Sequence, residues 1–327
     1  MKLVTFQINN HKPRIGVLAA DRVVDLNQAY RQLRARDFNA DFAAKMADVF
    51  FPASMIDFFR TGERGLQAAG EVLFAIEKDA QRFAAAKQKA LFKEEDVKLL
   101  APVPRPNTIR DFSTFEENQK RVTMKKSGGK IPDAWYQIPV YWKANPDNTI
   151  GPEEDVWMPR YSQQLDFELE FGIYIGKQGK DIPVEKAGEY IAGYTIFNDI
   201  SARDQQAKEM VMTFGPSKGK DFDHSKVFGP CLVTPDEFGT HGHRMTACIN
   251  GEVWGESSTD QMYYSFAQMI AYVSQCETLH PGDFLGSGTC PGGCGVEVDR
   301  YLNPGDLIEL EVAGIGLLRN RVIRKEG

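Results

Sequence analysis

Three carboxylates alternate with apolar residues in the segment 165–177, LDFELEFGIYIGK, and together they could bind a cation. Asp166, Glu168 and Glu170 share one face of the strand that this alternation predicts, because successive strand residues point to opposite faces. Same-face neighbours lie about 7 Å apart, and like charges that close repel unless they face water or bind a cation. The pattern therefore leaves two interpretations open: a solvated strand face, or a site for a divalent cation.

A second group of polar residues ends the next predicted strand, in the segment AGYTIFNDISARDQQ. Asn198, Asp199, Arg203 and Gln206 crowd the point where that strand stops. Loops held by a rigid sheet often carry reactive groups, although an Asx turn with surface charges is the alternative. Carboxylates without a nearby histidine or cysteine suit a hard cation such as Mg²⁺ or Ca²⁺, so the two segments together favour a metal site.

One lysine, Lys220, lies in the glycine-flanked segment GPSKGKDFDH. A lysine beside a metal-bound oxyanion can stabilise developing negative charge or handle a proton. The alternative is an ordinary exposed lysine.

The elements that must position these residues indicate an α+β fold. The chain has 327 residues, of which 42% are hydrophobic and 26% charged, as in an ordinary globular protein. The proline-rich segment VKLLAPVPRPNT predicts an extended connector and a domain boundary near residue 105. We expect a small α/β domain over 1–105, including one long amphipathic helix over 66–83, and a mixed β-rich domain over 106–327. A helix over 266–273 is the clear helical signal in the second domain.

Charge and composition argue against several classes of protein. The net charge of −6 and the pI of about 5.5 do not suit a nucleic-acid binder, which needs basic patches. No apolar run approaches the ~18 residues of a membrane span, and the N-terminus does not resemble a signal peptide. Five cysteines do not form the pattern of a disulfide framework, so we expect a cytoplasmic protein.

The segments DFELEFGIYIGK, GYTIFNDISARDQQ, GKDF and PGDFLGSGT together resemble the fumarylacetoacetate hydrolase (fumarylacetoacetase/acylpyruvase) family over about residues 105–327. The resemblance implies a fumarylacetoacetase-like catalytic domain of the β-sandwich or roll type, and a homodimer. It also implies Mg²⁺, or Ca²⁺ or Mn²⁺, held by Glu168, Glu170 and Asp199. A fourth carboxylate of fumarylacetoacetases falls at Thr114 in the best alignment, with Asp111 and Glu116 as further candidates.

The same resemblance implies roles for residues around the metal. Lys220 matches the family lysine near the metal, and Arg203 is placed with it among the catalytic residues. The residues implied to contact the substrate are Gln206, Tyr141, Trp142, Lys143, Gly288 and Thr289.

One position departs from the family pattern. Hydrolytic members place a water-activating histidine, often with a glutamate partner, in the segment after the RDF-like stretch. The nearest equivalents in this chain are Asn118 and Arg121, and residues 107–130 contain no histidine. A neutral amide cannot serve as a general base. Either Glu116 or Glu117 takes that role, or His224 replaces the histidine, or the reaction needs no such base.

The resemblance implies a small keto-acid substrate and an enolate stabilised by the metal as a Lewis acid. We rank C–C hydrolysis of a β-diketo acid first, of the fumarylacetoacetate or acylpyruvate type met in aromatic catabolism. Decarboxylation, isomerisation or dehydration of a 2-keto acid on the same site is the alternative. An inactive metal-binding scaffold is a third interpretation, which the retained cluster of like charges disfavours.

Overall fold

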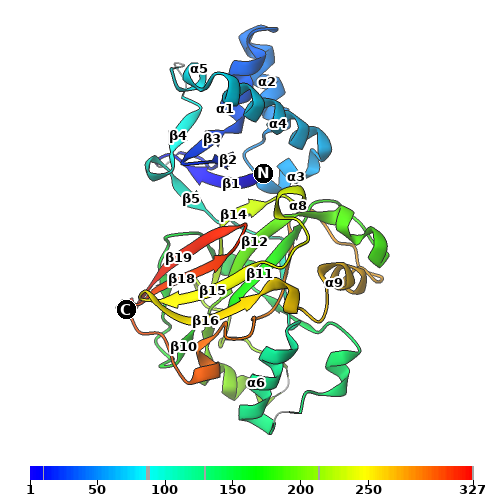
Figure 1. Ribbon diagram of the computed structural model, residues 1–327, viewed down its shortest axis with the longest axis vertical. Helices are drawn as coiled ribbons and strands as arrows, with labels where there is room; N and C mark the ends of the chain where they lie inside the picture. Colours follow the sequence, from blue (N-terminus) through cyan, green and yellow to red (C-terminus); the bar gives the residue numbers. More distant parts are fainter. Residues whose placement is uncertain (10, 86–88, 129, 213, 326–327) are drawn as a thin grey trace.

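A computed structural model describes residues 1–9, 11–85, 89–128, 130–212 and 214–325 of the chain. Within these residues the helices are α1 (Leu26–Arg34), α2 (Ala40–Phe50), α3 (Met55–Arg60), α4 (Glu63–Lys78), α5 (Ala80–Ala85), α6 (Glu116–Ser127), α7 (Arg203–Met210), α8 (Pro235–Phe238) and α9 (Phe266–Val273). Figure 1 shows α1, α2, α4 and α5 at one end of an elongated molecule, with α6 at the opposite end.

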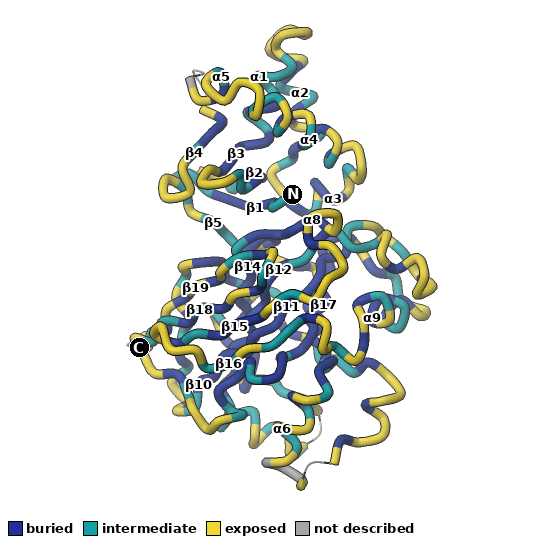
Figure 2. Tube along the Cα trace, in the orientation of Figure 1, coloured by how far each residue is buried: buried dark blue, intermediate teal, exposed yellow. Residues whose placement is uncertain are grey.

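Most strands belong to one large mixed sheet. Its strands are β1 (Lys2–Gln7), β2 (Arg14–Ala19), β3 (Arg22–Asp25), β4 (Leu91–Lys93), β5 (Lys98–Leu100), β6 (Thr108–Phe112), β7 (Tyr141–Ala144), β8 (Thr149–Ile150), β11 (Leu169–Ile175), β12 (Ile191–Asp199), β14 (Lys226–Val233) and β17 (Asp283–Gly286). They run in the order β4-β3-β2-β1-β14-β12-β11-β17-β6-β7, with β5 beside β1 and β8 beside β14. Figure 2 shows β11, β12 and β17 as buried strands at the centre of the larger part of the molecule.

Two smaller sheets complete the β-rich part. A five-stranded sheet has the order β16-β15-β18-β19-β9, and β10 pairs with β13. Their bounds are β9 (Val156–Trp157), β10 (Leu165–Asp166), β13 (Ser201–Ala202), β15 (Arg244–Ile249), β16 (Glu252–Ser258), β18 (Leu307–Val312) and β19 (Gly316–Ile323). Large sheets with helices outside them confirm the expected α+β class.

The large sheet passes through the predicted domain boundary. β1 pairs with β14 in antiparallel register, Lys2 opposite Val233, so the first strand of the chain extends the central sheet. The division at residue 105 stays a prediction.

The segment 165–177 forms two strands rather than one. β10 pairs with β13, and after Phe167 and Glu168 the chain joins the large sheet as β11, where every residue is buried. Asp166 and Glu170 are fully buried and Glu168 is 6% exposed. These carboxylates therefore do not form a solvated strand face, and their burial has to be balanced by partners inside the protein.

The predicted helices are correct in place but differ in continuity. α9 covers Phe266–Val273 with the expected apolar face buried. The long helix expected over 66–83 is two helices, α4 and α5, because Asp79 adopts a non-helical backbone conformation between them.

Candidate metal centre and active-site cavity

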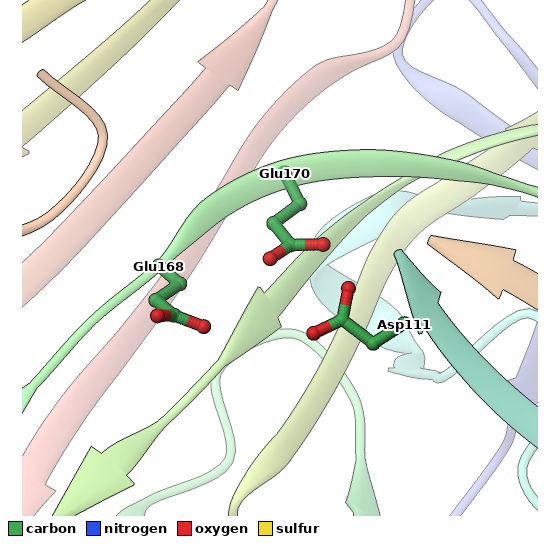
Figure 3. Close-up of side chains that lie close together, drawn as sticks. All are labelled: Asp111, Glu168 and Glu170. Carbon is green, nitrogen blue, oxygen red and sulfur yellow. The ribbon is translucent and has the colours of Figure 1, made fainter. Parts of the chain in front are cut away.

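Three buried carboxylates converge at the centre of the large sheet (Figure 3). One oxygen each from Asp111, Glu168 and Glu170 lies within 4.8 Å of the others. Asp111 comes from β6, Glu170 from β11, and Glu168 from the link between β10 and β11. Three oxygen ligands that close together form a geometry suited to a hard divalent cation.

A glycine makes room for this convergence. Strand β17 lies between β11 and β6, and its Gly286 pairs with Gly172 on one side and with Asp111 on the other. A Cβ atom at position 286 would lie 3.1 Å from Asp111 Oδ1 and 3.1 Å from Glu170 Oε2. The absent side chain therefore leaves the space into which the two carboxylates point.

Burial and mutual repulsion change the acidity of the cluster. Burial raises the pKa of Asp111 to about 7, although the charge of Lys220 opposes this shift. Burial, and after it the charge of Asp111, raises the pKa of Glu170 well above its usual range. Glu168 differs: although burial opposes it, Lys220 and Arg203 lower its pKa to about 2. Two of the three carboxylates are therefore costly as anions in the metal-free protein.

Three buried cations balance only part of the negative charge. Lys220 Nζ lies 2.5 Å from both Glu168 Oε2 and Asp199 Oδ2, and Lys226 Nζ lies 2.5 Å from Asp199 Oδ1. Arg203 contacts Glu168 at 2.8 Å and Asp166 at 2.8 Å. Five carboxylates and three cations leave a formal charge of −2 in this cluster. Its members are Asp111, Asp166, Glu168, Glu170, Asp199, Arg203, Lys220 and Lys226.

The residues present fit a divalent cation. Asp111 Oδ1 is buried and accepts no hydrogen bond, while Oδ2 accepts one from the Trp142 indole nitrogen at 2.8 Å. An orphaned buried carboxylate oxygen is costly unless another partner satisfies it. A divalent cation held by Asp111, Glu168 and Glu170 would supply that partner and offset the formal charge.

We predict that stabilisation by Mg²⁺ depends on pH through Asp111 and Glu170. Because their folded pKa values are raised, the metal-free fold binds extra protons between the ordinary Asp value of 3.8 and about 7, and its stability falls as pH rises through that window. Mg²⁺ must displace those protons. The rise in melting temperature on adding Mg²⁺ should therefore be largest above about pH 7 and disappear toward about pH 4. A constant rise across thermal scans at several pH values would contradict this assignment.

The cluster forms one wall of a cavity of about 370 Å³. The structure brings eight of the sequence-predicted site residues to this cavity: Glu168, Glu170, Arg203, Gln206, Lys220, Tyr141, Trp142 and Thr289. Asn118, Gln119 and Val122 of α6 also line the cavity, as does Cys294. Among the described residues that line the cavity there is no histidine.

Asp199 stays a predicted ligand, but its position differs from that of the three converging carboxylates. Both of its oxygens are held by lysines, so it orients Lys220 and Lys226 in this structure. The fourth family carboxylate was placed at Thr114 by alignment. The structure corrects this, because the Thr114 hydroxyl donates to the Ser287 carbonyl oxygen while Asp111 joins the cluster.

The three candidate replacement bases, Glu116, Glu117 and His224, are not among the residues that line the cavity, and Glu117 pairs with Arg121. Glu116 begins α6 and accepts a hydrogen bond from the Tyr136 hydroxyl at 2.8 Å, with Lys120 as its ion-pair partner. His224 stacks on Trp157 and bonds the Asp155 carbonyl oxygen at 2.7 Å. The side chains of Glu116 and His224 are both held by partners outside the cavity lining, and the catalytic role expected for Glu116 stays a prediction.

Two predicted substrate contacts are also placed differently. Lys143 is exposed and does not line the cavity, although its neighbours Tyr141 and Trp142 do. Gly288 donates its N–H to Glu170 Oε2 at 3.0 Å, and the Thr289 hydroxyl lies 3.4 Å from the other oxygen of Glu170. These two residues therefore contact a carboxylate of the cluster in this structure, and their contact with a substrate stays a prediction.

Sequence reasoning missed the contributions of Lys226 and Asp166. Lys226 begins β14 and is completely buried against Asp199. Asp166 accepts hydrogen bonds from Arg203 and from the backbone N–H groups of Gly295 and Val296. Asp166 therefore holds Arg203 and the loop at Gly295. The sequence pattern could not distinguish this role from that of Glu168 and Glu170, because all three carboxylates alternate in the same way.

Comparisons with known proteins agree with a catalytic fold of this kind. The family described as fumarylacetoacetate (FAA) hydrolase C-terminal matches residues 107–323. Oxaloacetate tautomerase Fahd2a, mitochondrial, of Rattus norvegicus is 30% identical over 331 residues, which cover 99% of this chain and 92% of the relative. Oxaloacetate tautomerase FAHD2A, mitochondrial, of Homo sapiens is 31% identical over 84% of this chain and 82% of the relative.

Solved structures of both a hydrolase and an isomerase are similar. The fumarylacetoacetate hydrolase of Exiguobacterium antarcticum has a TM-score of 0.71 and 25% identity, covering 99% of this chain and 100% of that one. A 5-carboxymethyl-2-hydroxymuconate delta-isomerase of Mycobacterium smegmatis has a TM-score of 0.60 and 30% identity, covering 73% and 87%.

The fold and the buried acidic cluster define an enzyme with a site that could bind a divalent metal. The chain belongs to the fumarylacetoacetate hydrolase family. Because its relatives include tautomerases and isomerases, family membership leaves the type of reaction open. The described residues include no helix long and apolar enough to cross a membrane. The names of the two tautomerases contain the word mitochondrial, so the cytoplasmic location of this chain stays a prediction.

Proposed function

We propose that this enzyme catalyses the keto–enol tautomerisation of a small 2-keto acid, with oxaloacetate as the first candidate substrate and Mg²⁺ as the cofactor. The observation that carries the proposal is the lining of the cavity: it combines a carboxylate cluster with two buried cations but has no histidine among its described residues. The similarity to oxaloacetate tautomerases over nearly the whole chain supports the choice of substrate. We keep a homodimer as part of the proposal.

Tautomerisation moves one proton between C3 and the C2 oxygen and breaks no carbon–carbon bond, whereas hydrolysis also needs a water nucleophile. A bound Mg²⁺ supplies a Lewis acid that favours negative charge on the substrate oxygens. Arg203 and Gln206, joined by a 3.0 Å hydrogen bond, orient the substrate carboxylate. The Lys220 ammonium group stabilises charge that develops on the oxygen at C2, because a preorganised cation costs no reorganisation in a dry site. No water has to be turned into a nucleophile.

Hydrolysis of a C–C bond, ranked first on family resemblance, becomes the second candidate. The similarity to a solved fumarylacetoacetate hydrolase favours it. It needs a base that activates water, and Asn118, whose amide lines the cavity, cannot remove a proton.

An absorbance assay tests the proposal. The decay of the enol form of oxaloacetate is followed with Mg²⁺ and again with excess chelator. We expect a Mg²⁺-dependent acceleration over the uncatalysed rate that the chelator abolishes. An acylpyruvate run in parallel should show no cleavage. Absence of acceleration on oxaloacetate, with cleavage of the acylpyruvate, would reverse the ranking.

A further inference from the structure

Asn118 lines the same cavity as the carboxylate cluster, and a buried glutamate fixes the orientation of its amide. Asn118 is 5% exposed and donates from Nδ2 to Glu297 Oε1 at 2.8 Å. The Glu297 side chain is 3% exposed and also accepts from Arg121 at 3.0 Å and from the N–H of Gly292 at 3.0 Å. A carboxylate that receives three donors acts as an acceptor, so the nitrogen and not the oxygen of the amide must face it.

The other end of the same amide is left to the cavity. Among the described residues no donor bonds Asn118 Oδ1, and it is not among the buried atoms that lack a partner. Because Asn118 lines the cavity, we take Oδ1 as the polar atom that it presents there. This oxygen can accept a hydrogen bond from a water or a substrate hydroxyl, but it cannot accept a proton at neutral pH.

The turn that carries Glu297 is hydrogen-bonded to Asp166 of the carboxylate cluster. Glu297 belongs to a short turn whose preceding residues, Gly295 and Val296, donate their N–H groups to Asp166. Asp166 also pairs with Arg203, so these hydrogen bonds connect the turn to the carboxylate cluster. The orientation of the Asn118 amide is therefore set by the same network that holds the candidate ligands.

We propose that Asn118, oriented by Glu297, is the residue that limits this site to proton transfer. Its carbonyl oxygen holds a water or hydroxyl in the cavity and leaves it un-ionised, so that no nucleophile forms beside the bound substrate. The proposal rests on the proposed function, and it names a specificity-determining residue for that reaction. Glu297 is a positioning residue, since it acts through Asn118.

The test installs a base at this position. In Asn118→His the imidazole would take a proton from water, the resulting hydroxide would add to the acyl carbonyl of an acylpyruvate, and the C–C bond would break. The bonding electrons pass to the pyruvate enolate, which takes up the proton, and a carboxylic acid is the second product. We expect hydrolysis to rise about 10²-fold or more above wild type, with a rate that increases with pH through the ordinary imidazole pKa of about 6.5.

Three further variants make the result specific. Gln119→His places a histidine on the same wall without the Glu297 partner, and it should gain no hydrolysis. Glu297→Gln added to Asn118→His should remove most of the gain and shift the pH profile. Asn118→Asp changes almost no volume and should give a smaller gain, which keeps the test valid if the histidine variant fails to fold.

The outcomes separate this inference from the proposed function. Failure of the wild type to tautomerise oxaloacetate, together with hydrolysis by Asn118→His, would remove the proposed substrate and keep the role of Asn118. Hydrolysis of the acylpyruvate by the wild type would overturn the inference. So would folded Asn118→His or Asn118→Asp protein that binds Mg²⁺ and cleaves no faster than wild type.

Discussion

Replacing Glu170 by glutamine should abolish turnover and at the same time stabilise the metal-free protein. Glutamine keeps the shape and can still accept the hydrogen bond from Gly288, but it removes a charge that burial and Asp111 make costly. We expect about 1–2 kcal/mol of added stability without metal at neutral pH, because the wild type must either bury the Glu170 charge or bind a proton there. Loss of the Lewis acid should remove several kcal/mol of transition-state stabilisation, or about 10³-fold in rate.

The opposite signs of the two effects make this variant informative. Denaturant unfolding without metal measures the stability, and calorimetric titration with Mg²⁺ measures the lost affinity. Glu311→Gln, an exposed carboxylate on β18, is the matched control and should change neither. Glu168 is a poorer target, because its removal leaves Lys220 and Arg203 without a shared partner. Wild-type, Mg²⁺-dependent turnover by Glu170→Gln would remove the metal assignment.

Replacing Lys220 by methionine should lower turnover while raising the affinity for Mg²⁺. The ammonium group lies 2.5 Å from Glu168 and from Asp199, so its removal makes the cluster more negative. Asp199 keeps Lys226 and Glu168 keeps Arg203, which limits the cost in stability to about 1–3 kcal/mol. Without the preorganised cation at the developing oxyanion we expect about 10²–10³-fold lower kcat.

The matched control is Lys218→Met, which removes an exposed lysine from the same loop. Steady-state kinetics at saturating Mg²⁺ and a Mg²⁺ titration are needed together. A purely structural lysine would lower stability, affinity and turnover in parallel. An unchanged kcat in folded Lys220→Met protein would exclude the catalytic role.

Much of the site could be predicted because it lies within single segments. Alternation along 165–177 places Glu168 and Glu170 on one face, and that relation follows from strand geometry alone. Lys220 follows from its glycine-flanked loop and the family resemblance, and the structure brings its ammonium group to Glu168 at 2.5 Å.

The position of Asp111 could not be predicted in the same way. It reaches the cluster because β6 runs parallel to β17, which in turn pairs with β11. Local patterns do not encode which strands become neighbours, since pairing over such sequence distances depends on tertiary packing. Alignment by sequence alone therefore favoured Thr114, three residues away. For the same reason the Asn118–Glu297 contact, which joins α6 to a distant turn, has no signal in the sequence.

The most direct test of the central claim is an NMR measurement on oxaloacetate in deuterated water with Mg²⁺ and enzyme. We expect deuterium to enter at C3 faster than without enzyme, a chelator to abolish this acceleration, and all carbon–carbon bonds to stay intact. Formation of oxalate and acetate, or of pyruvate and CO₂, at the rate of enzyme-dependent substrate loss would contradict it. That result would mean that the carboxylate cluster of Asp111, Glu168 and Glu170 serves bond cleavage and not proton transfer alone.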